Sequence, residues 1–158
     1  MPLREIRNSI FIARSPEQVY DYVTQPWRWH EWHPSSQGAK ASSKVMRQGE
    51  SFDEVIRLQP LSPLPITVRR QTHYHVDIAE PGECWQASGV TSGGGLTIHY
   101  ELTETNVEGE SGTLFRRRLT YQVKGFMRVL DPLLYTRMQD LSLVALKNLK
   151  DTLEEMDA

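Results

Sequence analysis

The sequence predicts an α+β domain in which a curved antiparallel sheet of about seven strands is covered by a long C-terminal helix. Between Gly38 and Lys124, short runs of alternating apolar and polar residues are separated by turn-forming residues, which is typical of antiparallel strands. From Asp131 to Met156, apolar residues recur at steps of three and four, which places them along one side of a helix. Each pattern leaves one apolar face, so sheet and helix are expected to pack against each other.

The composition is that of one ordinary domain, and we expect residues 1–158 to form it. The net charge of −2 gives no general attraction to nucleic acid or to anionic membranes, so a basic partner surface would have to be local. Cys84 is the single cysteine, which excludes an internal disulfide. The N-terminus lacks the apolar core of a signal peptide, and no apolar run is long enough to span a membrane. We expect a cytoplasmic protein that binds no nucleic acid and does not insert stably into membranes; its oligomeric state stays open.

The N-terminal part is predicted to form one strand and two short helices. Leu3 to Ile12 alternates as a strand. Ser15 and Gln18 have the spacing of a capping box, which begins a short helix. A second short helix over Trp27 to His33 would place Trp29 and Trp32 on one side.

The middle of the chain is predicted to form the remaining strands. The first two are joined by a hairpin turn at Gln48-Gly49, where glycine supplies a positive φ. The proline-rich stretch Pro60 to Pro65 is expected to be a loop, and Gly93 to Gly95 and Glu108 to Gly112 are expected to be turns. The expected strands are Ala39 to Arg47, Glu50 to Leu58, Ile66 to Ala79, Cys84 to Thr91, Leu96 to Thr105 and Thr113 to Val123.

The C-terminal helix is expected to begin with Asp131 as N-cap and Pro132 at the first helical position. Its first half carries more apolar residues than a single stripe requires, including Leu133 and Tyr135. This excess indicates that the early turns of the helix close over a pocket.

Several motifs resemble those of one protein superfamily. The segment IFIARSPEQVY, from Ile10 to Tyr20, looks like the superfamily's opening strand-to-helix junction, and Trp29 to Pro34 looks like its second helix. Gly112-Thr113 and the later Leu146 to Leu149 resemble its closing pattern. The chain is therefore identified as a member of the START/Bet v 1-like (SRPBCC) superfamily, nearest to its polyketide cyclase/dehydratase and lipid-transport-like subgroup. This resemblance implies a helix-grip fold, in which the sheet curls around the last helix and encloses a cavity, but it implies no particular reaction.

The inner face of the sheet can be inferred from strand alternation, because the more apolar face should turn toward the helix. Three charged residues, Glu54, Arg70 and Arg117, lie on such faces. A charge in a dry interior is costly unless it is paired, so we expect a structural ion pair such as Glu54 with an arginine, or arginines that reach solvent, or an arginine that anchors a ligand carboxylate or enolate. The inner-face residues of the strand from Ile66 are Ile66, Val68, Arg70, Thr72, Tyr74, Val76 and Ile78.

The same argument gives the other candidate ligand contacts. Tyrosines on the inner faces offer hydroxyl groups, although such residues are more often ordinary core residues. The candidates are Tyr74, Tyr100, Tyr121, Phe115, Trp29, Trp32, Leu134 and Met138.

We predict no metal site and no cofactor. His73 and His75 share a strand face that looks solvated, and His30 and His33 lack further ligands that would complete a zinc site. Cys84 has no evident base partner, so a nucleophilic role is not expected.

Three functions remain open. The first is binding or transport of a hydrophobic small molecule, such as a lipid, a quinone or a polyketide-like ring. The second is a cyclase or dehydratase in which Arg70, Arg117, Glu54 or a tyrosine handles protons. The third is a protein-interaction module with a vestigial cavity.

Overall fold

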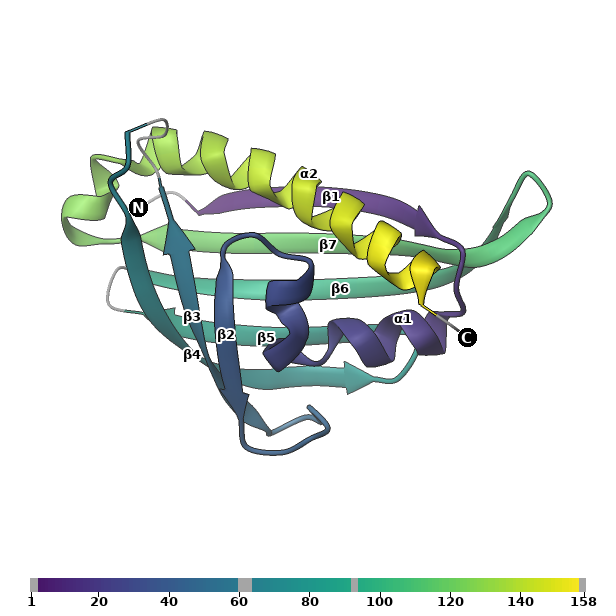
Figure 1. The fold of residues 1–158 in the computed structure, drawn as a ribbon. Coiled ribbons are helices and arrows are strands. Elements are labelled where there is room, and N and C mark those ends of the chain that lie inside the picture. Colours follow the sequence, from purple (N-terminus) through teal and green to yellow (C-terminus); the bar gives the residue numbers. More distant parts are fainter. Residues whose placement is uncertain (1–2, 60–63, 92–93, 157–158) are drawn as a thin grey trace.

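The computed structural model describes residues 3–59, 64–91 and 94–156, which form one seven-stranded antiparallel sheet with helices on its concave side (Figure 1). The strand order across the sheet is β1-β7-β6-β5-β4-β3-β2, so the first strand pairs with the last. The strands are β1 Arg4–Ile12, β2 Ser36–Ala41, β3 Ser51–Leu58, β4 Val68–Glu80, β5 Cys84–Thr91, β6 Gly94–Val107 and β7 Glu110–Val123. The helices are α1 Pro16–Val23, the 3₁₀ helix η1 Pro26–Glu31, the 3₁₀ helix η2 Gly125–Arg128 and α2 Asp131–Glu155.

Helix α2 crosses the concave side of the sheet, and one core lies between the two (Figure 1). Leu134, Leu149 and Leu153 of α2 are buried in that core together with Ile12 of β1. The predicted sheet, its terminal helix and the packing of one on the other are therefore confirmed.

The N-terminal elements also form where the sequence predicts them. Ser15 accepts a hydrogen bond from the backbone N–H of Gln18, whose side chain accepts one in return from the backbone of Ser15, so the capping box is present. Trp29 in η1 and Trp32, the residue directly after η1, are both buried in the core. The short helices thus close the sheet beside α2.

The start of α2 differs from the expectation. Leu130 occupies the N-cap position and makes no side-chain cap, while Asp131 is the first helical residue. The Asp131 carboxylate instead pairs with Arg4 of β1, with Nε and Oδ2 2.9 Å apart. The predicted Asp131 cap is wrong because a cationic partner on the adjacent strand binds the carboxylate.

The predicted hairpin forms, since β2 and β3 pair antiparallel and Gly49 has a φ of 94°, but the expected tight turn at Gln48-Gly49 is wrong. Strand β2 ends at Ala41 and β3 begins at Ser51, so residues 42–50 form a longer connection. Met46 in this connection is buried, and its carbonyl accepts a hydrogen bond of 3.1 Å from Trp85 Nε1. Filling the core and satisfying the Trp85 N–H therefore replace only the strand pairing that was expected for the residues next to the turn.

Strand β4 contains an irregularity that alternation did not reveal. Its register shifts between Val76 and Ile78, so Val76 pairs with inward-facing Ala87 while Ile78 pairs with Gln86 on the outer face. Ala79, rather than Ile78, packs against the core. Ile66 lies before the strand and is exposed, so both ends of the predicted inner face of this strand are wrong.

The turn predicted at Glu108 to Gly112 is tighter than expected: Glu108 and Gly109, with φ of 52° and 83°, join β6 to β7. The turn predicted at Gly93 to Gly95 is described only from Gly94 onward. Gly94 already begins β6, and Gly93 lies outside the described residues. Of the expected loop Pro60 to Pro65, residues 60–63 also lie outside them.

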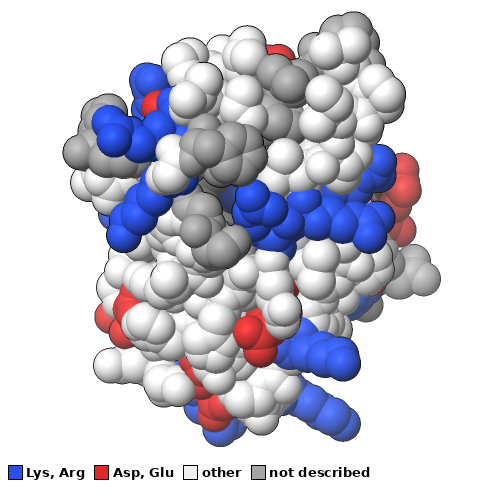
Figure 2. All heavy atoms as spheres, turned by 90° about the vertical axis from the view of Figure 1, so that its left-hand side faces the viewer, with Lys and Arg blue, Asp and Glu red and all other residues white. Residues whose placement is uncertain are grey.

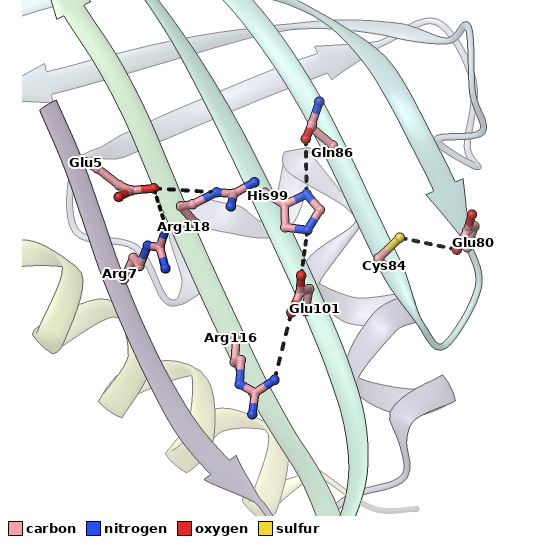
Figure 3. Close-up of polar contacts among 9 residues, drawn as sticks. All are labelled: Glu5, Arg7, Glu80, Cys84, Gln86, His99, Glu101, Arg116 and Arg118. Carbon is pink, nitrogen blue, oxygen red and sulfur yellow. Dashed lines mark hydrogen bonds and ion pairs between the residues drawn. The ribbon is translucent and has the colours of Figure 1, made fainter. Parts of the chain in front are cut away.

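The outer face of the sheet is polar and carries a row of paired side chains (Figure 3). His99 lies between Gln86 and Glu101, at 3.1 Å and 3.3 Å, and Glu101 is 3.9 Å from Arg116. Cys84 donates a hydrogen bond to Glu80, and burial together with this bond raises the pKa of the Cys84 thiol to about 11. This face therefore contains a neutral thiol and no activated nucleophile among these residues.

Candidate functional site

A cavity of about 120 Å³ lies between the concave face of the sheet and the first half of α2. Most of its lining is apolar, as expected for a site that takes an apolar ligand. The lining residues are Trp29, Trp32, His33, Ser35, Glu54, Ile56, Leu58, Val68, Arg70, Thr72, Tyr74, Thr91, Gly94, Gly95, Leu96, Ile98, Tyr100, Arg117, Leu119, Tyr121, Gln122, Val123, Leu134, Met138 and Leu141.

The structure brings almost all of the candidate residues to this cavity. Glu54, Arg70 and Arg117 line it, as do the three tyrosines, both tryptophans, Leu134 and Met138. Phe115 does not line it; the ring is fully buried and packs against Tyr100, with ring centroids 5.1 Å apart. The inner-face assignment of β7 is therefore correct, although Phe115 belongs to the core behind the cavity.

Arg117 is buried without an anionic partner. Only 5% of its surface is exposed, and the described residues form no ion pair with it. Its Nη1 donates to Ser142 Oγ at 3.2 Å, and Ser142 in turn donates to Asn8 Oδ1 at 2.5 Å. Its Nε has no hydrogen-bond partner. The guanidinium is thus held in place by neutral groups and forms no ion pair with a described carboxylate, although its charge lowers the pKa of Glu54.

Glu54 is the second buried charged residue of the cavity. Its burial raises the pKa of this carboxyl to about 7, while hydrogen bonding and the charge of Arg117 act in the opposite direction. The hydroxyl of Tyr74 donates to Glu54 Oε1 at 3.3 Å. Among the described residues no ion pair joins Glu54 to Arg117 or Arg70, so the expected structural ion pair is absent there.

His33 also lines the cavity, whereas its sequence pattern suggested only a possible metal ligand. Burial and the nearby positive charge of Arg117 lower the pKa of His33 to about 3, so the ring is neutral at physiological pH. Its Nδ1 contacts Ser35, with 2.8 Å to the hydroxyl and 3.2 Å to the backbone N–H. The one sequence feature that could have indicated that His33 lines the cavity is its position directly after the buried Trp32.

Several polar atoms of the cavity wall have no hydrogen-bond partner in the protein. They include Thr72 Oγ1, Tyr121 Oη and Trp32 Nε1, in addition to Arg117 Nε and Arg70 Nε. Buried polar groups are almost always paired in folded proteins, because an unpaired one costs about 1–3 kcal/mol. Unpaired donors gathered around one apolar cavity are the pattern expected of a binding site.

The tyrosines of the wall are neutral donors and acceptors. Burial raises the pKa of Tyr100 to about 12, although the neighbouring Arg117 opposes this, and burial also raises the pKa values of Tyr74 and Tyr121. The ring of Tyr74 fits its place because Gly89 lies opposite on β5: a Cβ there would be 2.7 Å from the ring. The glycine therefore makes room for a cavity residue.

No group of three or more His, Cys, Asp or Glu that could hold a metal ion occurs among the residues that the structure describes. His73 and His75 instead contact Asp53 and Asp77 singly, at 2.9 Å and 3.0 Å, on the outer face.

Comparison with known proteins identifies a family whose sequences match this chain. The model of the family described as "Polyketide cyclase / dehydrase and lipid transport" matches residues 4–154. No curated protein matches the sequence.

Solved structures match over nearly the whole chain. An aromatase/cyclase from Streptomyces sp. R1128 has a TM-score of 0.71 and 8% identity, over 97% of this chain and 94% of that one. A protein from Thermus thermophilus has a TM-score of 0.68 and 18% identity, over 95% and 97%. A START superfamily protein from Mycobacterium smegmatis has a TM-score of 0.61 and 14% identity, over 95% and 94%. At these identities the matches establish the fold, which is the predicted helix-grip fold.

Proposed function

Because the chain belongs to the polyketide cyclase/dehydrase and lipid transport family, we propose that it binds or carries a hydrophobic small molecule in its internal cavity. The observation that carries this proposal is the set of unpaired polar atoms on an otherwise apolar wall. A ligand with a lipid, quinone or polyketide-like body would bury apolar surface there and pair with some of these atoms.

Arg117 is proposed to bind an anionic oxygen of this ligand. A buried guanidinium without a counterion is costly, and a ligand carboxylate or enolate would offset that cost through charge-assisted hydrogen bonds. Ser142 and Asn8 support the proposal because they hold the guanidinium in place without neutralising its charge. The apolar residues of early α2, Leu134 and Met138, would contact the body of the ligand.

The test compares carboxylate ligands with neutral ligands of the same shape. Dodecanoic acid and 1-dodecanol are added to the protein, and the unfolding temperature is measured. A ligand at 100 times its dissociation constant stabilises the protein by about 2.7 kcal/mol, which gives a shift of several degrees. We expect the acid to bind more tightly than the alcohol. Arg117→Met should remove that preference, weakening the acid by about 1.5–3 kcal/mol.

The matched control is Arg116→Met, since Arg116 is the adjacent arginine and lies on the opposite, solvent-exposed face. This control should leave both affinities unchanged. If neither probe, nor a naphthoquinone, shifts the unfolding temperature of the unaltered protein, the carrier proposal is wrong and the protein-interaction module is favoured. An Arg117→Met protein that keeps its preference for the acid would reject only the anchor.

An enzyme of the cyclase or dehydratase kind is the second candidate, and the pKa of Glu54 favours it. A carboxyl with a pKa of about 7 exchanges protons readily at neutral pH, and Arg117 nearby would stabilise an enolate formed beside it. The test is deuterium uptake from D₂O at the carbon next to the ketone of 4-benzoylbutyrate, followed by mass spectrometry. The protein should accelerate the uptake and Glu54→Gln should abolish that acceleration; if the protein does not accelerate it, this candidate loses its support.

A further inference from the structure

The cavity reaches one end of the molecule, where two segments meet. Leu58 and Val68, which flank the β3–β4 connection, line it together with Leu134 and Met138 of early α2. Residues 64–70 and residues 121–138 therefore border the same end of the cavity, and we call these two segments the mouth surface. Figure 1 shows this end on its left side, where α2 begins.

The mouth surface is strongly basic. Its two segments contain five basic residues and one acidic residue, a net charge of +4, whereas the whole chain carries −2. The acidic residue, Asp131, is already paired with Arg4. Three of the basic residues, Arg69, Lys124 and Arg128, are exposed, while Arg137 is partly exposed and Arg70 also lines the cavity. Figure 2 views this end and shows Lys and Arg side chains gathered around its hollowed middle.

Aliphatic side chains project from the same two segments. Leu64 and Ile66 are 56% and 50% exposed, and Val129 and Leu133 are 81% and 51% exposed. Single exposed aliphatic residues are common on protein surfaces, but four of them among five cations on one end are not explained by packing within the chain.

We infer that the mouth surface docks on an anionic lipid bilayer. Basic residues attract anionic headgroups and exposed aliphatic residues enter the boundary between headgroups and acyl chains, which is how peripheral proteins bind membranes. A nucleic acid would use the cations but would gain nothing from four exposed aliphatic side chains. Among the described residues, no helix is long and apolar enough to cross a membrane.

Docking in this orientation would bring the end of the cavity to the bilayer. Apolar compounds concentrate in the bilayer, so a ligand would pass between membrane and cavity without exposing its full apolar surface to water. This surface lies outside the group of Arg117 and Glu54, and the inference stands whether the ligand is carried or transformed.

The test is sedimentation with vesicles of phosphatidylcholine alone and of phosphatidylcholine mixed with phosphatidylglycerol. The protein should bind the mixed vesicles and be released by added salt, because the attraction is screened. Lys124→Gln and Arg128→Gln should each weaken binding about fivefold, the effect of about 1 kcal/mol per basic residue near an anionic surface. Val129→Ser should weaken it about tenfold through lost apolar contact.

Matched controls come from other parts of the chain. Lys44→Gln in the β2–β3 connection, Lys147→Gln on the second half of α2 and Val107→Ser at the β6–β7 turn change exposed residues away from the mouth surface. They should leave vesicle binding within about twofold of the original.

The inference is overturned if the protein ignores phosphatidylglycerol vesicles at low salt, or if the controls weaken binding as much as the mouth variants. Ligand affinity in solution, measured by thermal shift on the same variants, should not change. Loss of vesicle binding with intact ligand binding thus separates this inference from the proposed function.

Discussion

Glu54 is one of two cavity residues whose ionisation is expected to make stability depend on pH. Its folded-state pKa of about 7 lies above the ordinary value of 4.5, so the native state holds a proton that the unfolded chain releases. Its contribution to stability is full below the unfolded pKa and is lost as the pH rises through the folded pKa. The difference between the two pKa values corresponds to about 3 kcal/mol.

His33 acts in the opposite sense over an overlapping range. Its folded-state pKa of about 3 lies below the ordinary 6.5, so its contribution is present above the unfolded pKa and is lost as the pH falls toward the folded one. The two effects oppose each other between the two unfolded values. The pH dependence of the unaltered protein alone therefore does not isolate Glu54.

A comparison with Glu54→Gln isolates it. The free energy of unfolding of this variant minus that of the original should rise by about 3 kcal/mol between about pH 4 and about pH 8. Urea titration at several pH values measures this difference. Glu104→Gln, at an exposed position on β6, is the control and should give a constant difference. A constant difference for Glu54→Gln would mean that Glu54 ionises as it does in the unfolded chain.

At the scale of elements, Arg14 links the C-terminus of α2 to the β1–α1 connection. Its Nη2 donates to the carbonyls of Glu154 and Met156 at 2.6 Å and 2.8 Å. The last carbonyls of a helix have no partner within the helix, so a cation there satisfies hydrogen bonds and complements the helix dipole. The backbone of Ala13 adds a bond of 2.8 Å to Glu154 Oε2.

Arg14→Ala should therefore destabilise the protein by about 1.5–3 kcal/mol, the value of a hydrogen bond to a charged group. Denaturant unfolding measures the loss, and hydrogen exchange should show faster exchange in the last turns of α2. Arg116→Ala removes an arginine with 55% of its side chain exposed and should change stability by less than about 0.5 kcal/mol. Equal effects of the two substitutions would show that the Arg14 contacts contribute nothing.

At the scale of the whole molecule, the sheet and α2 share one core and are expected to unfold together. Trp29 and Trp85 lie in this core with Phe52 and Tyr74, and their ring centroids are 4.6–6.2 Å apart. Tryptophan fluorescence therefore reports on the packing of the core, and far-ultraviolet circular dichroism reports on the sheet and helices.

The two signals should change at the same temperature in one transition, with an enthalpy of about 110 kcal/mol for a chain of 158 residues. Calorimetry gives the enthalpy independently. A loss of helical signal before the change in fluorescence would show that α2 separates from the sheet before the sheet unfolds.

Most of the fold and part of the cavity wall follow from local patterns in the sequence. Strand β5 has the predicted bounds, the capping box at Ser15 is present, and the inner face of β7 carries Arg117 as alternation predicts. These features depend on the period of side chains along an element and on residues a few positions apart. The sequence therefore also places Glu54, Tyr74 and the early residues of α2 on the face that becomes the cavity.

Other features depend on contacts between distant residues and could be found only in the folded chain. The bulge after Val76 turns Ile78 to the outer face of the sheet, Met46 enters the core from the end of a predicted strand, and Asp131 pairs with Arg4 instead of capping α2. The same holds for Arg117, which Ser142 and Asn8 hold without neutralising it. Burial and hydrogen bonding are properties of the assembled core, so the charge of Arg117 and the raised pKa of Glu54 become functional features only when sheet and helix enclose them.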